Sequence, residues 1–252
     1  MRNLLAFDLG ASNGRAILGQ FDGEKITMRE LHRFENNYIE MNGVFYWDLP
    51  YLYNQLKQGF LAFKNANVGE LDCFGIDTWG VDYALLDEND EVIRPAILWN
   101  DGRTVEETNY LNNVIGKDKL SQYTANIAFT GFTAPKILWV KNNEPENFAR
   151  IRKIMLPKDY IAYKLSGVFC TDVSDASGML IFDVKNRCWS KEMCDICGVK
   201  PEQLATVYES YEKVGCVLPE IADELGIPQT CIIAAGAGDN AAAAVGTGTV
   251  GD

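Results

Sequence analysis

Apolar and polar residues alternate along the first forty residues of the chain. Three alternating runs, at 3–9, 15–21 and 25–34, are separated by the turn sequences GASNG and DGEK. A period of two over short runs that are bounded by Gly, Asn and Asp is typical of β-strands joined by tight turns. The pattern therefore predicts an antiparallel three-stranded meander.

The period changes after residue 50. Apolar residues recur at Leu52, Leu56, Phe60 and Phe63, which predicts an amphipathic helix over 50–63. A strand at 71–77 follows, and two short strands flank the turn ENDE. Helical segments are expected at 104–114, 134–142, 145–152, 158–165 and 190–197, and a strand at 230–239 is expected to run into a helix that begins at Asn240. This order predicts one mixed α/β domain with insertions and no internal linker.

Composition removes several function classes. The 252 residues are 47% apolar, with a formal net charge of −12 and no run of Lys or Arg, so nucleic acid is not an expected partner. No stretch reaches the roughly 20 consecutive apolar residues that span a membrane, so no membrane-spanning helix is expected. Seven cysteines without a secretory signal indicate reduced thiols and a cytoplasmic protein. Small phosphorylated ligands remain open, because local N–H groups bind them.

Familiar catalytic motifs are scarce. His32 is the single histidine and lies in a strand-like run, so triad and histidine–zinc chemistry have little to build on. Cys194 and Cys197 form a C-x-x-C that reads as one face of a helix packed in the core. The GTGTVG at 246–251 follows an Ala-rich run rather than a strand, so its match to a dinucleotide fingerprint is interpreted as chance.

Three turns that carry Asp and Gly each follow an apolar strand: DLGASNGR at 8–15, DTWGVD at 77–82 and GAGDN at 236–240. An acid at a strand end, followed by glycines, is how α/β folds place carboxylates beside metal-bound phosphates. In the first turn, the alternative is a plain hairpin in which Asp8 makes a turn hydrogen bond. In the third, Asp239 either accepts a proton from a substrate hydroxyl or caps the helix at Asn240.

The whole chain resembles the N-terminal half of the FGGY carbohydrate kinases, in the ribonuclease-H-like, actin-like ATPase superfamily. The long signature GFTAPKILWVKNN at 131–143 carries the resemblance, together with the turns at 8–15 and 236–240. It implies an α/β, ribonuclease-H-like domain with a mixed five-stranded sheet and flanking helices over 1–245. Residues 246–252 would begin the connection to a second domain that this chain lacks.

The resemblance also implies the site. Asp239 would be the catalytic base that takes the proton of a sugar hydroxyl, and Asp8 would hold Mg²⁺. The implied ATP phosphate site consists of Asp8, Gly10, Ala11, Ser12, Asn13, Gly14 and Arg15. The implied sugar site consists of Trp79, Gly80, Val81, Asp239 and Asn240. Trp79 either stacks on the sugar or belongs to the core. The segment 99–103 is a further candidate wall. Arg103 in it either contacts the sugar or forms a structural ion pair, and we expect the ion pair.

The sugar itself is a ketose in this interpretation. Residues 1–93, with GIDTWGVD, look most like rhamnulokinases, whereas LPKDYIAYKLSG and SDASGMLIFDV after Arg94 look most like xylulokinases. Gly80 and Val81 stand where xylulokinases carry a Met-His pair, and Gly238 stands where rhamnulokinases usually carry His. Xylulose is the first choice and rhamnulose the second.

Two other classes stay open: a sugar-binding module of the same fold without catalysis, and an ATPase that acts on a non-sugar. Without a second domain to close the cleft, the chain is expected to fold but not to phosphorylate sugar. The face that would meet that domain should be exposed, and we expect weak self-association there, as a homodimer.

Overall fold

The computed structural model describes residues 1–249, and its main sheet is mixed. That sheet consists of β1 (Arg2–Leu9), β2 (Asn13–Phe21), β3 (Ile26–Glu35), β6 (Cys73–Thr78), β14 (Lys213–Cys216), β15 (Ile232–Ala234) and β16 (Ala237–Gly238). The strand order is β14-β15-β6-β1-β2-β3, and β16 continues the β15 position beside β6. β1, β2 and β3 form the antiparallel meander, while β6 runs parallel to β1, β15 and β16.

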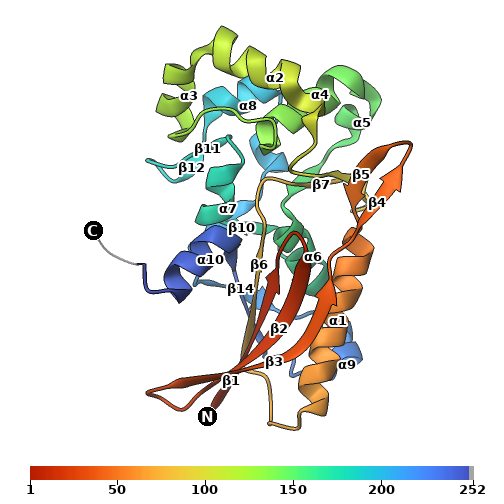
Figure 1. The fold of residues 1–252 in the computed structure, drawn as a ribbon, viewed down its shortest axis with the longest axis vertical. Helices are drawn as coiled ribbons and strands as arrows, with labels where there is room; N and C mark the ends of the chain where they lie inside the picture. Colours follow the sequence, from red (N-terminus) through yellow and green to blue (C-terminus); the bar gives the residue numbers. More distant parts are fainter. Residues whose placement is uncertain (250–252) are drawn as a thin grey trace.

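Ten α-helices within residues 1–249 surround this sheet and build a second region above it (Figure 1). They are α1 (Leu49–Asn65), α2 (Val105–Asn109), α3 (Lys117–Thr124), α4 (Thr133–Asn143), α5 (Pro145–Arg150), α6 (Pro157–Ser166), α7 (Val173–Gly178), α8 (Lys191–Cys197), α9 (Pro219–Leu225) and α10 (Asp239–Gly246). A π-helical segment at Tyr110–Gly116 joins α2 to α3, and short 3₁₀ turns lie at Gly102–Thr104 and Pro201–Gln203.

Small sheets connect the helices. They pair β4 (Tyr38–Met41) with β5 (Val44–Trp47) and β8 (Ala96–Ile97), β7 (Ala84–Leu86) with β9 (Lys153–Met155), β10 (Cys170–Asp172) with β13 (Thr206–Tyr208), and β11 (Phe182–Asp183) with β12 (Cys188–Trp189). None of the helices among residues 1–249 has the length and apolarity needed to cross a bilayer.

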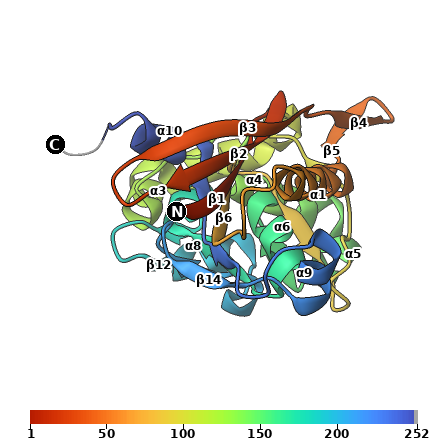
Figure 2. The same cartoon turned by 90° about the horizontal axis from the view of Figure 1, so that it is seen from below.

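The core has two parts. One face of the main sheet is covered by α1, α6 and α9 (Figure 2), and its cluster includes Phe7, Phe60 and Phe74, whose rings contact one another. The helix α1 forms here because its apolar positions fall on one stripe and Asp48 accepts the Tyr51 N–H at its N-terminus. A second cluster fills the space between α3, α4 and α8.

The predicted meander, the helix at 50–63 and the mixed α/β class are confirmed, with boundaries shifted by one or two residues. The sheet has seven strands rather than five. β14 adds an edge strand that no alternating pattern marks, and the strand expected at 230–239 is divided into β15 and β16. The helix expected at 104–114 is a 3₁₀ turn, α2 and the start of the π-helical segment. The helix expected to begin at Asn240 is α10, which begins one residue earlier, at Asp239.

Candidate active site

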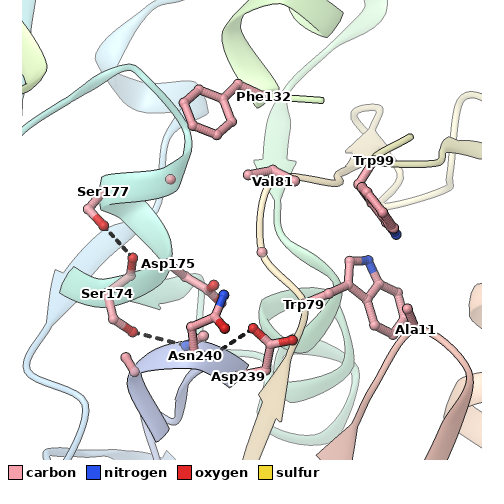
Figure 3. Close-up of a pocket in the computed structure, with 14 residues that line it drawn as sticks. Ala11, Trp79, Val81, Trp99, Phe132, Ser174, Asp175, Ser177, Asp239 and Asn240 are labelled. Carbon is pink, nitrogen blue, oxygen red and sulfur yellow. Dashed lines mark hydrogen bonds between the residues drawn. The ribbon is translucent and has the colours of Figure 1, made fainter. Parts of the chain in front are cut away.

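A pocket with a volume of about 550 Å³ lies where the two parts of the core meet (Figure 3). Figure 3 shows Trp79 and Trp99 on one side, Val81 and Phe132 above, and Asp175, Asp239 and Asn240 on the other side. The lining residues are Ala11, Trp79, Gly80, Val81, Trp99, Phe132, Ser174, Asp175, Ser177, Gly178, Gly238, Asp239, Asn240 and Ala241. All five residues of the predicted sugar site are among them.

Three carboxylates converge at the strand ends below this pocket. Asp8 on β1 and Asp77 on β6 are register partners, and Asp77 is also the partner of Ala237, two residues before Asp239. Burial, followed by the charges of Asp8 and Asp239, raises the pKa of Asp77 to about 7 against the opposing charge of Arg15. The parallel strands thus collect excess negative charge at one edge of the sheet.

The predicted phosphate hairpin is the β1–β2 turn. Asp8 forms an ion pair with Arg15 at 2.9 Å between Oδ2 and Nε, and the Gly10 N–H donates to the Asn13 carbonyl at 2.9 Å. The loop residues Ala11 and Ser12 are exposed, and their N–H groups donate no hydrogen bond within residues 1–249. Ala11 reaches the pocket and the remaining residues of the hairpin do not.

Gly14 has a packing role. A Cβ at this position would lie 2.2 Å from the ring of Phe34 on the neighbouring strand. A side chain here would have to displace the Phe34 ring, so packing favours glycine independently of any ligand.

Asp239 owes its position to a break in the strand before it. Gly236 has a φ of +77°, and a Cβ there would lie 2.1 Å from the Ile76 carbonyl oxygen. After this break the chain pairs again as β16 and enters α10. The N-cap residue is Gly238, whose N–H donates to Ser174 Oγ at 2.9 Å, so the interpretation of Asp239 as the helix cap was wrong. Asp239 Oδ1 instead accepts the adjacent Asn240 N–H at 2.7 Å.

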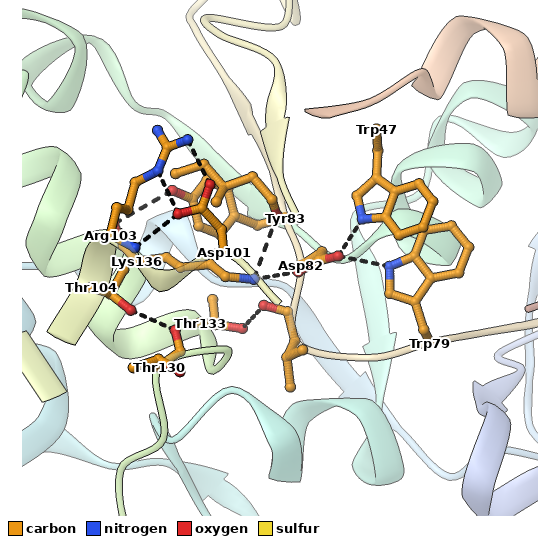
Figure 4. Close-up of polar contacts among 12 residues, drawn as sticks. Trp47, Trp79, Asp82, Tyr83, Asp101, Arg103, Thr104, Thr130, Thr133 and Lys136 are labelled. Carbon is orange, nitrogen blue, oxygen red and sulfur yellow. Dashed lines mark hydrogen bonds and ion pairs between the residues drawn. The ribbon is translucent and has the colours of Figure 1, made fainter. Parts of the chain in front are cut away.

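Trp79 is held by a buried charge (Figure 4). Asp82 is fully buried and accepts hydrogen bonds from the indole N–H groups of Trp47 and Trp79, and from Lys136 on α4. The two indoles stack with centroids 4.1 Å apart. Trp79 is only 5% exposed, so it belongs to the core and forms a pocket wall at the same time.

The backbone beside Trp79 is strained. The Asp82 N–H donates to the Gly80 carbonyl at 2.9 Å, and the residue between them, Val81, has a φ of +69°. This three-residue γ-turn with positive φ is rare for any residue and unfavourable for a β-branched one. The Val81 carbonyl accepts the Thr133 hydroxyl at 2.7 Å, which anchors the turn to α4.

A second buried charge cluster lies behind the opposite wall. The Lys158 ammonium is 2.6 Å from Asp159, 2.9 Å from Asp172 and 3.3 Å from Asp175. Asp172 caps α7 and accepts hydrogen bonds from the hydroxyls of Ser174 and Ser210. This cluster fixes the start of α7 against the pocket.

The family is decided by a comparison that covers almost the whole chain. Residues 3–246 match the model described as "FGGY family of carbohydrate kinases, N-terminal domain". The chain belongs to this family.

The named relatives within the FGGY family are sugar kinases. The chain is 45% identical to a xylulose kinase of Escherichia coli over 66% of its length and 34% of that protein's, and 34% identical to one of Lactococcus lactis over 99% and 50%. It is 30% identical to a rhamnulokinase of Lactiplantibacillus plantarum over 100% and 51%. A crystal structure named as a "xyloylose kinase" from Brucella ovis aligns with a TM-score of 0.89 at 35% identity, over 98% of this chain and 51% of that one. The chain therefore spans about a third to a half of these proteins.

Other sequence expectations have structural outcomes. Arg103 forms the expected ion pair with Asp101, at 2.7 Å, and packs over the ring of Trp139. Of the segment 99–103, only Trp99 lines the pocket. Cys194 and Cys197 are buried, and burial raises their thiol pKa values to about 11 and 12, as expected of core residues. The GTGTVG match extends beyond the described residues, as do the last three residues, 250–252, of the connection expected at 246–252.

The pocket is also lined by residues that the sequence did not predict, among them Phe132, Ser174, Asp175 and Ser177. The last three lie in the SDASG run of α7, where one acid and two hydroxyl residues occur close together. This grouping was the available signal, but the run is too short to show a helical period. Among residues 1–249, no three His, Cys, Asp or Glu side chains form a ready group for a metal ion.

Proposed function

We propose that this chain is the sugar-binding half of an ATP-dependent ketose kinase, that Asp239 is its catalytic base, and that xylulose is its ketose. The observation that carries the proposal is the place of Asp239, which lies on the pocket wall at the N-terminus of α10, beside Gly238 and Asn240. Membership in a family of carbohydrate kinases supports a sugar kinase reaction. Catalysis in this proposal requires a second, nucleotide-binding domain in a longer protein.

The chemistry assigned to Asp239 is a proton transfer. A primary hydroxyl of the ketose attacks the γ-phosphorus of ATP, the new O–P bond replaces the bond to ADP, and the hydroxyl proton moves to the carboxylate. Asp239 Oδ1 is occupied by the Asn240 N–H, so Oδ2 is free to receive the proton. Trp79, Val81 and Phe132 give the sugar apolar walls and exclude water from one side.

The strand ends fit a nucleotide and its metal ion. Free N–H groups at Ala11 and Ser12 suit phosphate oxygens, and the negative charge of Asp8 and Asp77 suits a cation. Mg²⁺ keeps several waters and takes only one or two carboxylates, so Asp8 would suffice to hold it. When bound, the ion neutralises charge on the phosphates.

Rhamnulose is the second candidate. It is favoured by rhamnulokinases that are 30–31% identical over 84–100% of the chain, and by Gly80 and Val81 at the sugar wall. Xylulose comes first because the xylulose kinase relatives reach 45% identity.

Titration calorimetry of the 252-residue chain with xylulose, rhamnulose, fuculose and the aldose xylose tests the substrate class. We expect xylulose to bind most tightly and xylose least. Ala241→Phe, which fills the pocket, should abolish binding, whereas Ala243→Phe, on the exposed side of the same helix, should leave it unchanged. Tighter binding of rhamnulose would reverse the order of the two sugars, and binding unaffected by Ala241→Phe would place the sugar elsewhere.

A further inference from the structure

Asp175 is a buried carboxylate on the pocket wall that the proton transfer to Asp239 does not use. It lies in the first turn of α7, and its residue is 2% exposed. Its Oδ2 forms an ion pair with Lys158 at 3.3 Å and has no other polar partner among the described residues. No residue among 1–249 donates a hydrogen bond to its Oδ1 either. A buried carboxylate with one long ion pair and one oxygen without a hydrogen-bond donor is costly to keep.

The Lys158 cluster does not explain why this carboxylate is present. One ammonium faces three carboxylates, and Asp159 and Asp172 are closer to it than Asp175. Asp159 and Asp172 already neutralise the charge of Lys158. A third buried negative charge at Asp175 therefore adds desolvation cost and electrostatic repulsion. Burial, together with the neighbouring charges, raises the pKa of Asp175 to about 7 against the opposing effect of Lys158. The reason for an acid here lies on the other side of the side chain.

That other side is the pocket, where two glycines flank Oδ1. A Cβ at Gly80 would lie 3.0 Å from this oxygen, and a Cβ at Gly238 would lie 2.9 Å from it. Both glycines line the pocket with Asp175. The Gly238 N–H is bound to Ser174 Oγ, which itself donates to Asp172, so the frame around the oxygen is fixed. Glycine on both sides keeps the carboxylate oxygen uncovered at the wall.

We propose that Asp175 Oδ1 accepts a hydrogen bond from a ketose hydroxyl other than the one that is phosphorylated, and so selects sugars that carry this hydroxyl. This inference rests on the proposed function. The walls formed by Trp79, Val81 and Phe132 offer no charged group, so a carboxylate opposite them is a strong acceptor for a polyol. A sugar that lacks the hydroxyl would leave the buried oxygen unpaired, which is the most discriminating arrangement available to a binding site.

The test is xylulose binding to the 252-residue chain, measured by calorimetry. In Asp175→Asn, Lys158 attracts the amide oxygen, so the NH₂ group turns to the pocket and an acceptor becomes a donor. We expect Asp175→Asn and Asp175→Ala to weaken xylulose binding about ten- to a hundredfold, the effect of losing a hydrogen bond to a charged group. Asp159→Asn is the matched control, because it removes a closer charge from the same lysine without touching the pocket.

Deoxyketoses, each lacking one hydroxyl, separate a contact from a structural effect. The deoxyketose that lacks the contacted hydroxyl should bind the wild-type chain as weakly as xylulose binds the Asp175→Asn variant. Its affinity should be the same for the wild-type chain and for Asp175→Asn. Wild-type affinity for xylulose in both Asp175 variants would overturn the inference while leaving ketose binding intact. The inference would also be overturned if the Asp175 variants and Asp159→Asn all lost the same affinity for xylulose and for every deoxyketose. Asp175 would then act only through the buried charge cluster around Lys158. A wild-type chain that binds no ketose would refute the proposed function itself.

Discussion

At the scale of single residues, Val81 shows how much strain the pocket wall contains. A β-branched side chain with a φ of +69° costs on the order of 1–3 kcal/mol, and the fold keeps it only because the Asp82 and Thr133 hydrogen bonds hold the turn on both sides. Such strain persists where surrounding structure fixes the backbone, and it presents the Val81 side chain to the pocket.

Replacing this valine by glycine should cost little stability. Val81→Gly releases the positive-φ strain, which offsets the lost apolar contacts and the greater entropy of the unfolded chain. Val207→Gly is the matched control, since Val207 is also half-buried but lies in β13 with ordinary backbone angles. In urea unfolding, we expect Val207→Gly to be the more destabilising by about 1–3 kcal/mol. Equal losses would show that Val81 is not strained.

Asp175 makes the free energy of unfolding depend on pH. Its pKa is about 7 in the folded chain, because of burial, and about 3.9 when unfolded. Between these values the folded state binds more protons, so the contribution of Asp175 to stability falls as pH rises from about 4 to about 7.

The Asp175→Asn variant should therefore gain stability relative to wild type between about pH 5 and about pH 8, as measured by urea unfolding at each pH. Asp183→Asn is the control. The N–H groups of Asn186 and Lys185 lower the pKa of Asp183, so its titration lies below this window and its difference from wild type should stay constant. A constant difference for Asp175→Asn as well would contradict the raised pKa.

At the scale of elements, the step from β15 through Gly236 to β16 and α10 positions Asp239. The chain leaves the sheet after Ala234 and rejoins it at Ala237. Only a residue without Cβ fits at Gly236, against the Ile76 carbonyl. This step moves the strand end so that α10 begins at the pocket.

Gly236→Ala should lower the free energy of unfolding by at least about 2 kcal/mol, through the clash with Ile76 and the left-handed backbone. Gly246→Ala, at the end of α10 where a Cβ meets nothing, should be neutral or stabilising by about 0.5–1 kcal/mol. Thermal and urea unfolding of both variants check this. A tolerated alanine at residue 236 would show that the strand break is adaptable.

Elements with a clear period could be predicted from the sequence, and those set by distant contacts could not. β1 alternates between buried and more exposed positions along its whole length, and α1 carries a regular apolar stripe, so both were found within two residues. The break at Gly236 depends on a carbonyl 160 residues earlier in the chain, which no local pattern contains. The helix α7 has six residues, too few for a visible period.

The candidate site divides in the same way. The turns with Asp8, Trp79 and Asp239 could be found because strand ends with Asp and Gly are local signals. Phe132 and Asp175 reach the pocket from segments whose local sequences resemble ordinary helix starts. The tertiary arrangement, and not the sequence pattern, makes them part of the site.

At the scale of the whole molecule, the pocket lies at the junction of the two core clusters. Trp79 belongs to the cluster under the main sheet, and Phe132 packs against the cluster of the helical region. The buried pair of Asp82 and Lys136 joins these regions next to the pocket, which makes its geometry depend on both. Both regions therefore determine the shape of the pocket, and Asp239 is among the residues that line it.

The turnover number of an Asp239 variant tests the central claim most directly. In the longer protein that the proposal requires, Asp239→Asn should lower xylulose-dependent ADP release by about 10²–10⁴-fold, with unchanged melting temperature and xylulose affinity, because only the proton acceptor is lost. Asp118→Asn, in the first turn of α3 and away from the pocket, should keep normal turnover. Near-normal turnover in Asp239→Asn would contradict the assignment of Asp239 as the catalytic base.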